Sequence, residues 1–293
     1  FKGKLIFCFQ TAPNSTIHLM VSIIIPAFNE EKTIVDCLES LSKQTYPSYE
    51  IIVVDDGSTD KTFEVLSKFQ YPISNIQYKI RRQKHVGPGI ARNFGAKHAR
   101  GEILLFIDAD MTFDKDFIKN LINPIIKRES NGTFTKEEYV ANWNNVWARC
   151  WNYNEGIFNK SRIPESYPDT SPVFRAILRS EFESVKGFDD IGYTDDWTLS
   201  RKLGFQATLS RGVICYHRNP DTLKEIYLQA LWIGKNEFIS GSLIRRLYNL
   251  MRYSLCVQIL KALFIVLKTG ELKQFLFQIV YSFGINISIL NNK

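Results

Sequence analysis

Five consecutive apolar residues, Ile103 to Ile107, run directly into Asp108 and Asp110. An uninterrupted apolar run indicates a strand buried on both faces, because a strand with one solvated face would alternate. Ligands of open α/β sheets bind beyond the carboxyl ends of such strands. Two carboxylates there suit a hard divalent cation that also binds phosphate oxygens. An Asp-x-Asp pair alone is a weak signal, and the alternative is that Asp110 caps a turn while Asp108 is solvated.

The preceding sequence alternates strands with helices. Apolar runs predict strands at 21–26 and 50–55, and a shorter strand is expected at 76–81. Helical spacing of apolar residues follows Asn29 and the turn at 55–60, and the loop at 85–93 enters a third helix. This order predicts a parallel sheet with right-handed crossovers, typical of a nucleotide-binding half-domain. The first strand is followed by neither Gly-x-Gly-x-x-Gly nor a P-loop, so those two nucleotide-binding classes are unsupported.

Four segments carry a family resemblance: IIIPAFNEE at 23–31, VVDDGSTD at 53–60, GPGIARN at 87–93 and FIDAD at 106–110. In this order and spacing they resemble the family 2 glycosyltransferases of the GT-A fold, over residues 21 to about 240. The resemblance implies an α/β fold with a Rossmann-like, mostly parallel sheet flanked by helices. It also implies inverting transfer of a hexose from a UDP- or GDP-sugar.

The same resemblance implies a donor site at the ends of the first strands. The residues expected to contact the nucleotide are Pro26, Ala27, Phe28, Glu30, Val54, Asp56, Arg92 and Ala109. Asp56 is the one expected to accept hydrogen bonds from the base. The alternatives are that Asp55 and Asp56 only shape a turn and that Arg92 is a surface charge.

The resemblance assigns Asp108 and Asp110 to Mg²⁺ or Mn²⁺ that bridges the donor phosphates. Such a metal stabilises the charge that builds on the departing diphosphate. His217, at the end of a strand predicted over 208–217, is expected to be a third ligand. A histidine that is merely hydrogen-bonded in a loop is the alternative.

The segment GYTDDWTLSRKLG at 192–204 resembles the family's Thr-Glu-Asp motif, with Asp195 in place of Glu. The match places Asp196 as the general base, which an inverting transfer needs to take the acceptor's hydroxyl proton. Asp195, Trp197 and Arg175 are assigned to the acceptor or the diphosphate. The alternative is that both acids only cap a helix beginning at Trp197. The segment 168–172 lacks the glycine common in the family, so the sugar pocket is the least transferable part.

Aromatic residues crowd the segment 136–154, and the spacing of Trp143, Trp147 and Trp151 predicts one face of a helix. That face either packs on the core or forms an acceptor- or membrane-facing wall. A further helix is expected over 223–241.

The charge of +7 is concentrated in the last part of the chain, where residues 235–293 hold eight Lys or Arg against Glu237 and Glu271. Apolar residues at helical spacing alternate there with basic ones, which is typical of helices that lie on an anionic membrane. We therefore expect a membrane surface and no nucleic acid. A tail packed on the core and a membrane-spanning hairpin are alternatives. Five scattered cysteines show no metal or redox spacing and indicate free thiols in a reducing compartment.

These observations predict a leader or added extension at 1–20 and a catalytic domain at 21–241. The domain divides into a nucleotide-binding half, 21–112, and an acceptor half, 113–241. Basic amphipathic helices at 242–293 would hold the protein on the cytoplasmic face of a membrane as a peripheral or monotopic protein. The expected acceptor is a lipid-linked or glycan hydroxyl.

Three other functions fit less well. A polyprenyl-phosphate sugar synthase, like dolichol-phosphate mannose synthase, needs no base because its acceptor is a phosphate. A nucleotidyltransferase usually carries a Gly-rich basic loop after the first strand, and none is found here. An inactive scaffold that binds nucleotide and membrane is the non-enzymatic alternative.

Overall fold

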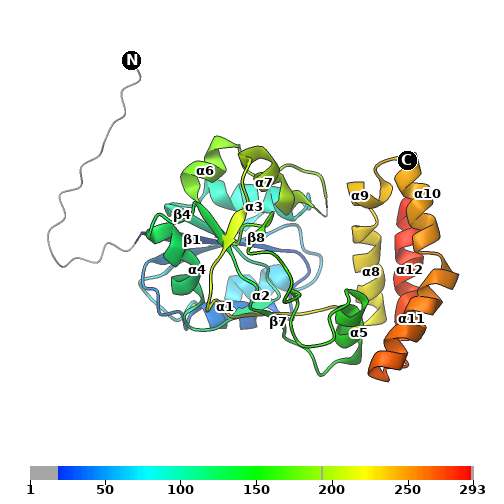
Figure 1. Cartoon of the computed structure of the whole chain (residues 1–293). Coiled ribbons are helices and arrows are strands. Elements are labelled where there is room, and N and C mark those ends of the chain that lie inside the picture. Colours follow the sequence, from blue (N-terminus) through cyan, green and yellow to red (C-terminus); the bar gives the residue numbers. More distant parts are fainter. Residues whose placement is uncertain (1–18, 193, 292–293) are drawn as a thin grey trace, which may run out of the picture.

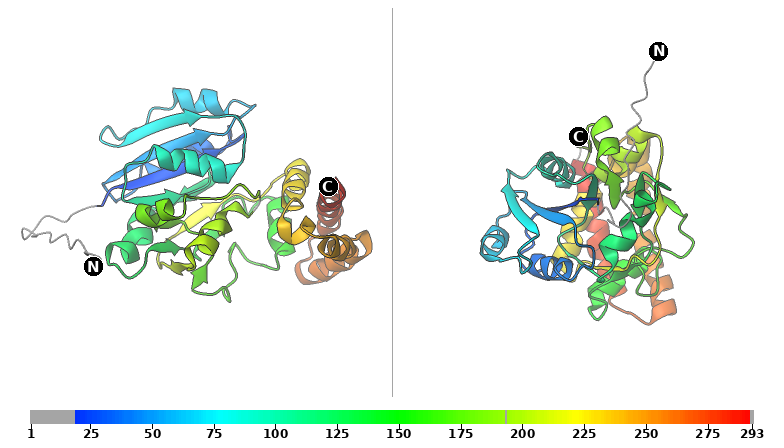
Figure 2. Two further views of the ribbon diagram at one scale, coloured as in Figure 1. Left: turned by 90° about the horizontal axis from the view of Figure 1, so that it is seen from above. Right: turned by 90° about the vertical axis from the view of Figure 1, so that its left-hand side faces the viewer.

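The structure is a computed structural model that describes residues 19–192 and 194–291. A sheet-containing unit lies beside a layer of helices from the C-terminal part of the chain (Figure 1; Figure 2). Most of the predicted leader, residues 1–18, lies outside the described residues.

The described residues form an eight-stranded sheet in the order β3-β2-β1-β4-β9-β6-β10-β8. Its first half consists of parallel strands, as predicted from the apolar runs: β1 (Val21–Ala27), β2 (Tyr49–Asp55), β3 (Gln77–Arg82) and β4 (Ile103–Phe106). β1 lies between β2 and β4, so the carboxyl ends of these strands meet at one edge.

The apolar runs are explained by cover on both faces of the sheet. In β1, Ile23 and Ile25 face a core shared with α1 (Ile34–Leu41) and α4 (Phe117–Ile126), whereas Ile24 faces a core shared with α3 (Pro88–Lys97). All three isoleucines are fully buried. At α3 the approach is close, because a Cβ on Gly95 would lie 2.6 Å from a methyl carbon of Ile24.

The second half of the unit is mixed rather than parallel. Its strands in the large sheet are β6 (Gly132–Phe134), β8 (Thr170–Ser171), β9 (Ala176–Leu178) and β10 (Ala207–Leu209). A smaller sheet has the order β5 (Met111–Phe113), β11 (Cys215–His217), β7 (Glu138–Val140). Besides α4, this half contains α6 (Arg179–Ser184), η1 (Asp195–Trp197) and α7 (Thr198–Leu203), and α2 (Thr62–Lys68) belongs to the first half.

Two predicted elements are wrong in this half. The strand expected over 208–217 is interrupted by a turn between β10 and β11, where Gly212 has a φ of +69°. The helix expected to carry all three tryptophans begins only at Val146. Asn145 caps it, because its side-chain oxygen accepts hydrogen bonds from the N–H groups of Trp147 and Ala148. Trp143 therefore precedes α5 (Val146–Asn154) and is not part of its face.

The helical layer consists of α8 (Leu223–Ile233), α9 (Glu237–Ser240), α10 (Leu243–Arg252), α11 (Leu255–Thr269) and α12 (Gln274–Asn291). α12 packs closely along α8, since a Cβ on Gly284 would lie 2.7 Å from Cβ of Ala230. α5 joins this core through Trp151, whose ring contacts Phe277 and Tyr281. The predicted boundary at 241/242 falls within this packed layer, and the helix expected over 223–241 is divided into α8 and α9.

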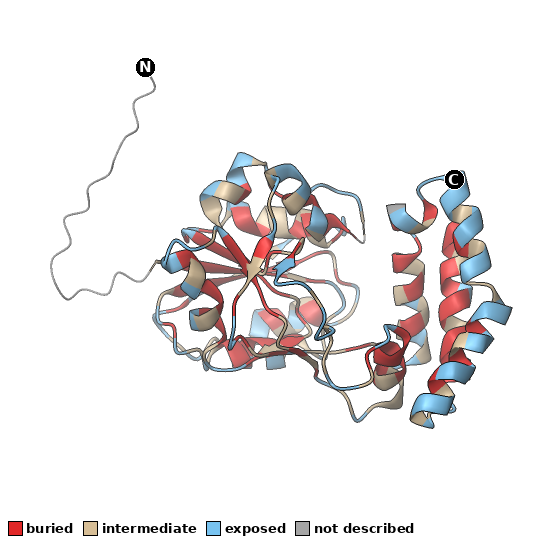
Figure 3. Cartoon of the chain, viewed as in Figure 1, coloured by how far each residue is buried: buried red, intermediate tan, exposed pale blue. Residues whose placement is uncertain are grey.

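The outer surface of the layer carries many exposed apolar side chains, and Figure 3 shows exposed residues along α10 and α11. Leu243, Ile244 and Met251 are 72%, 80% and 68% exposed. Within residues 19–192 and 194–291, no single helix is long and apolar enough to cross a membrane. Taken together, α10 and α11 meet that test by length and composition, although they bend by 49° at their junction.

Candidate active site

The candidate site lies at the carboxyl edge of the large sheet. Asp108 and Asp110 follow β4, and Asp56 follows β2. Pro26 and Ala27 end β1, and Val54 is buried near the end of β2. Ala109, between the two aspartates, is buried. The parallel order β2-β1-β4 therefore brings the predicted donor residues to one edge.

Asp108 is held between two arginines. Its Oδ1 lies 2.8 Å from Nη2 of Arg92, and its Oδ2 lies 3.1 Å from Nη1 of Arg175. Burial alone would raise the pKa of Asp108, but the two guanidinium groups hold it well below its ordinary value. Asp108 is therefore a fixed anion that positions both arginines.

Asp110 faces His217 across the pairing of β5 with β11. Oδ1 of Asp110 lies 3.1 Å from Nε2 of His217, and Nδ1 of His217 lies 2.8 Å from Oε1 of Glu138. Glu138 is buried and also pairs with Arg175 (3.0 Å) and Arg162 (3.1 Å). Burial would raise the pKa of Glu138, yet these positive partners hold it well below its ordinary value.

The pair formed by Asp110 and His217 fits a divalent metal. With metal–ligand bonds of about 2.1 Å and octahedral geometry, adjacent ligand atoms are about 3 Å apart. The observed 3.1 Å is at present the length of an ion pair: burial and Arg162 lower the pKa of His217, but Asp110 and Glu138 raise it to about 9. A metal at this position would take the place of the proton between Asp110 and His217. Metal-binding histidines usually donate their second ring N–H to a carboxylate, and Glu138 occupies that position. In the described part of the chain no group of three His, Cys, Asp or Glu residues is arranged to hold a metal. Asp108, which was predicted to be a ligand together with Asp110, is instead held in its two ion pairs.

Glu30 lies on the metal side of the site. Burial and the negative charges of Asp110 and Asp108 raise its pKa to about 7, against the hydrogen bond that it accepts from the Thr33 hydroxyl. A bound cation would reduce the electrostatic repulsion between these clustered carboxylates. Glu30 was predicted to contact the nucleotide, but the structure places it near Asp108 and Asp110, the predicted metal ligands.

Asp56 is only 2% exposed, and its carboxylate holds the loop that leads into α3. Oδ2 accepts a hydrogen bond from the N–H of Gly87 (2.9 Å) and lies 2.9 Å from Nδ1 of His85, while Oδ1 accepts one from Nε2 of Gln83 (2.6 Å). In this structure the carboxylate oxygens of Asp56 therefore already accept hydrogen bonds from the protein, whereas they were predicted to accept them from the base of the nucleotide. Above them the ring of Phe28 stacks on His85, with 3.9 Å between centroids. Phe28 and His85 are both partly open to solvent.

The acidic motif meets the beginning of α3. Asp195 is buried there, 3.4 Å from Nη1 of Arg92, and a Cβ on Gly89 would lie 2.6 Å from its Oδ2. Burial raises the pKa of Asp195, with Arg92 acting against it. Arg92, predicted to face ribose or diphosphate, is therefore an ionic bridge between Asp108 and Asp195.

Asp196 is partly buried beside this bridge. Burial raises its pKa to about 6; the positive charge of Arg92 opposes the shift, and the charges of Asp195 and Asp108 add to it. A carboxylate tuned towards neutral pH suits general base chemistry.

Trp197 connects the acidic motif with the helical layer. Its ring lies 5.8 Å from that of Phe238 in α9. The guanidinium groups of Arg201 in α7 and Arg245 in α10 lie 5.5 Å and 5.6 Å from the Phe238 ring. The segment that carries Asp196 therefore rests against α9.

The structure brings together Glu30, Arg92, Asp108, Asp110, Arg175, Asp195 and His217, and Asp196 adjoins them. Sequence reasoning missed Glu138, Gln83 and His85. Glu138 is recognisable only once β7 is paired with β11, because Glu138 and His217 then share one face while Tyr139 and Tyr216 share the other.

The sequence model described as "Glycosyl transferase family 2" matches residues 22–185. The chain is 39% identical over 101 residues to the poly(ribitol-phosphate) beta-N-acetylglucosaminyltransferase TarS of Staphylococcus aureus. That match covers 34% of this chain and only 18% of TarS. Glycosyltransferase GlyG of Streptococcus pneumoniae is 25% identical over 205 residues, covering 62% of this chain and 64% of GlyG.

Among solved structures, the chain is similar to the mannosyltransferase PcManGT from Pyrobaculum calidifontis in complex with GDP-Man and Mn²⁺. The TM-score is 0.64 at 18% identity, and the match covers 98% of this chain and 91% of that one. At this identity the likeness shows the fold, which is GT-A, as predicted.

Proposed function

Because the chain belongs to glycosyl transferase family 2, we propose that it moves a hexose, with inversion, from a UDP- or GDP-sugar to the hydroxyl of a lipid-linked or glycan acceptor. The reaction would take place at a membrane surface. Solved relatives support a nucleotide-sugar donor, since TarS was crystallised with UDP-GlcNAc and PcManGT with GDP-Man.

The observation that carries the proposal is Asp196, a partly buried carboxylate whose pKa is raised to about 6 beside the Arg92–Asp108 pair. Asp196 would take the proton of the acceptor hydroxyl. The oxygen's electron pair then forms the new bond to the anomeric carbon. The bond from that carbon to the diphosphate oxygen breaks, and the nucleoside diphosphate leaves with the electron pair.

Arg92 and Arg175 would hold the carboxylates of the site in position before the substrates bind. Arg175 is fixed at both ends, by Asp108 and by Glu138, and Arg92 is fixed by Asp108 and Asp195. Arginines held by two carboxylates lose little freedom when a substrate binds, so the adjoining carboxylates stay in place. Asp195 would serve as the anchor of the motif, and Asp196 as its reactive member.

Asp110 and His217 would hold Mg²⁺ or Mn²⁺, with Glu138 setting the orientation of the His217 ring. The metal, when bound, would act as a Lewis acid on the donor diphosphate. The Mn²⁺ in the PcManGT structure supports divalent metal use.

Membrane association is proposed from the helical layer. α10 exposes Leu243, Ile244, Leu247 and Met251, and its basic residues are Arg245, Arg246 and Arg252. An exposed apolar face flanked by basic groups fits the interface of an anionic bilayer. Cys37, Cys150, Cys215 and Cys256 are free thiols, which supports the reducing, cytoplasmic face of that membrane.

The test of the proposed reaction is the Asp196→Asn variant, with the exposed Asp190→Asn as its control. Transfer of labelled sugar from UDP- and GDP-sugars into a membrane extract is measured together with donor binding. We expect Asp196→Asn to bind donor normally and to lose about 10²- to 10⁴-fold in transfer. Transfer close to that of the control would show that Asp196 is not the base.

A further inference from the structure

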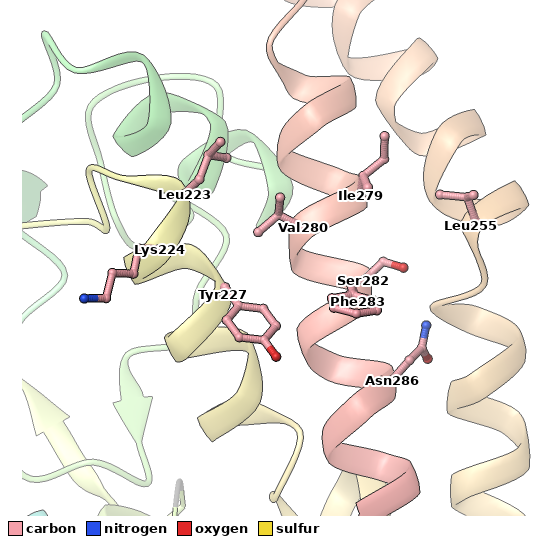
Figure 4. Close-up of a pocket in the computed structure, with 9 residues that line it drawn as sticks. All are labelled: Leu223, Lys224, Tyr227, Leu255, Ile279, Val280, Ser282, Phe283 and Asn286. Carbon is pink, nitrogen blue, oxygen red and sulfur yellow. The ribbon is translucent and has the colours of Figure 1, made fainter.

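A groove of about 750 Å³ lies within the helical layer, between α8 and α12 and reaching the start of α11. Figure 4 shows its nine lining residues: Leu223, Lys224, Tyr227, Leu255, Ile279, Val280, Ser282, Phe283 and Asn286. The rings of Tyr227 and Phe283 stack across the two helices with 6.0 Å between centroids. No residue of the candidate active site lines this groove.

The lining is apolar over most of its length. Its uncharged polar groups come from Tyr227, Ser282 and Asn286. The Ser282 hydroxyl and the Asn286 amide nitrogen both donate to the carbonyl oxygen of Tyr253 at 2.9 Å, whereas Oδ1 of Asn286 is buried without a hydrogen-bond partner among the described residues. A ligand in the groove would therefore meet mainly hydrocarbon and aromatic rings.

The groove opens onto the exposed apolar surface of the layer. Leu255, Ile279 and Phe283 line the groove and are also 51%, 43% and 59% exposed. Exposed apolar residues also occur along α10 and α11, among them Ile244 and Leu267. If the outer face of α10 and α11 contacts a bilayer, hydrocarbon can enter the groove without crossing water.

The charge around the groove favours a lipid with an anionic headgroup. Lys224 lies at the α8 end of the groove and points away from α12 (Figure 4). Among the described residues Lys224 takes part in no ion pair. After residue 237 the only acidic residue of the chain is Glu271, and it is paired with Arg149 at 3.0 Å. The carboxylates nearest to Lys224 in the sequence are both engaged: Asp221 pairs with Arg218 at 2.8 Å, and Glu225 accepts a hydrogen bond from the N–H of Asp221 at 2.9 Å.

We propose that the groove between α8 and α12 holds an acyl chain of an anionic membrane phospholipid, with Lys224 near the phosphate. The proposal rests on the proposed membrane contact and adds to it a specific lipid site. A seated chain would fix α8 relative to α12. α8 begins six residues after His217, so the lipid would also steady the strand end that carries His217.

The experiment uses the full chain and vesicles of phosphatidylcholine and phosphatidylglycerol. A trace of phosphatidylglycerol carries a photoactivatable acyl chain, and labelled peptides are mapped by mass spectrometry. The test variant, Val280→Trp, fills the groove. Its matched control, Leu276→Trp, changes an exposed residue one turn away that does not line the groove. We expect labelling of Tyr227 and Phe283, about tenfold weaker in Val280→Trp and unchanged in Leu276→Trp.

A second variant, Lys224→Glu, alters only an exposed charge and covers the case in which Val280→Trp fails to fold. It should weaken groove labelling by the phosphatidylglycerol probe and leave labelling by a phosphatidylcholine probe unchanged. Labelling confined to the outer face of α10 and α11 would overturn the groove site while leaving the membrane contact standing. Loss of vesicle binding by the unchanged chain would overturn both. Sugar transfer, assayed separately, tests the proposed reaction whichever result is obtained.

Discussion

Gly89 and Asp195 are in contact at the beginning of α3, so closely that a Cβ on Gly89 would lie 2.6 Å from Oδ2 of Asp195. Gly89, the second glycine of the GPGIARN segment, thus leaves room for the acidic motif of 192–204. This contact joins the nucleotide-binding half to the segment that carries Asp196.

Gly89→Ala should displace Asp195 and, with it, Asp196. We expect a fall in kcat of about 10²-fold with donor affinity within a few-fold, because a displacement of about 1 Å at a reacting group has this effect. Gly270→Ala is the control, since Gly270 has open space around its Cβ position but a φ of +74°. The Gly270→Ala variant therefore shows how far backbone strain at a glycine outside the active site lowers kcat. Equal kcat values in the two variants would show that the contact is not needed.

The pH profile should report Asp196. Burial raises its pKa to about 6, and a general base acts only when ionised. We therefore expect kcat/KM to be level above this pH and to fall about tenfold per unit below it. Donor binding measured over the same range separates this effect from loss of substrate. An inflection near the ordinary aspartate pKa of about 3.9 would contradict the assignment.

Arg175→Met should destabilise the fold. It would leave Asp108 and Glu138 short of a buried partner, which costs about 3–5 kcal/mol. The control is Arg211→Met, whose pair with Asp169 is exposed and should change the unfolding free energy by less than about 1 kcal/mol. Urea unfolding at neutral pH gives both values, and equal stabilities would count against the network.

The same network sets the response to acid. The pKa values of Asp108 and Glu138 lie below their ordinary values in the folded chain. Their stabilisation is therefore complete above about pH 4 and is lost as the pH falls through the folded values. In Arg175→Met this loss should become smaller, because part of the pKa depression is removed.

Charges placed on the outer face of α10 should release the protein from membranes. Ile244→Asp combined with Leu247→Asp removes two exposed apolar groups without touching the packed core. Co-sedimentation with anionic vesicles should fall by about tenfold or more. The control pair, Val86→Asp with Ile191→Asp, changes exposed apolar residues of the sheet-containing unit. Retained binding by the α10 variant would place the membrane contact elsewhere.

The parallel half of the sheet could be predicted because its strands are buried on both faces and read as uninterrupted apolar runs. The two wrong elements lie where short strands and turns replace long periodic segments. The spacing of the three tryptophans matched a helix, yet the cap at Asn145 starts that helix after Trp143. At 208–217 the turn containing Gly212 carries little apolar signal.

The part of the site that could be predicted is the part formed by one continuous segment, such as Asp108 and Asp110 after β4. The partners of these residues were not predictable, because they come from strands and helices distant in the sequence. Arg175, just before β9, and Glu138 from β7 reach the site only through strand pairing. For the same reason the sequence could not show that Asp108 is held by arginines while Asp110 faces His217.

We propose that Asp110 and His217 bind a divalent metal together with a nucleotide-sugar donor, on which the transfer assigned to Asp196 depends. Calorimetric titration of UDP and of GDP, each with and without Mn²⁺, tests it most directly in the unchanged chain and in Asp110→Asn. We predict that one nucleotide binds with Mn²⁺ far more tightly than without it, and that Asp110→Asn removes this difference. Equal affinity with and without Mn²⁺, or binding of neither nucleotide, would contradict the account.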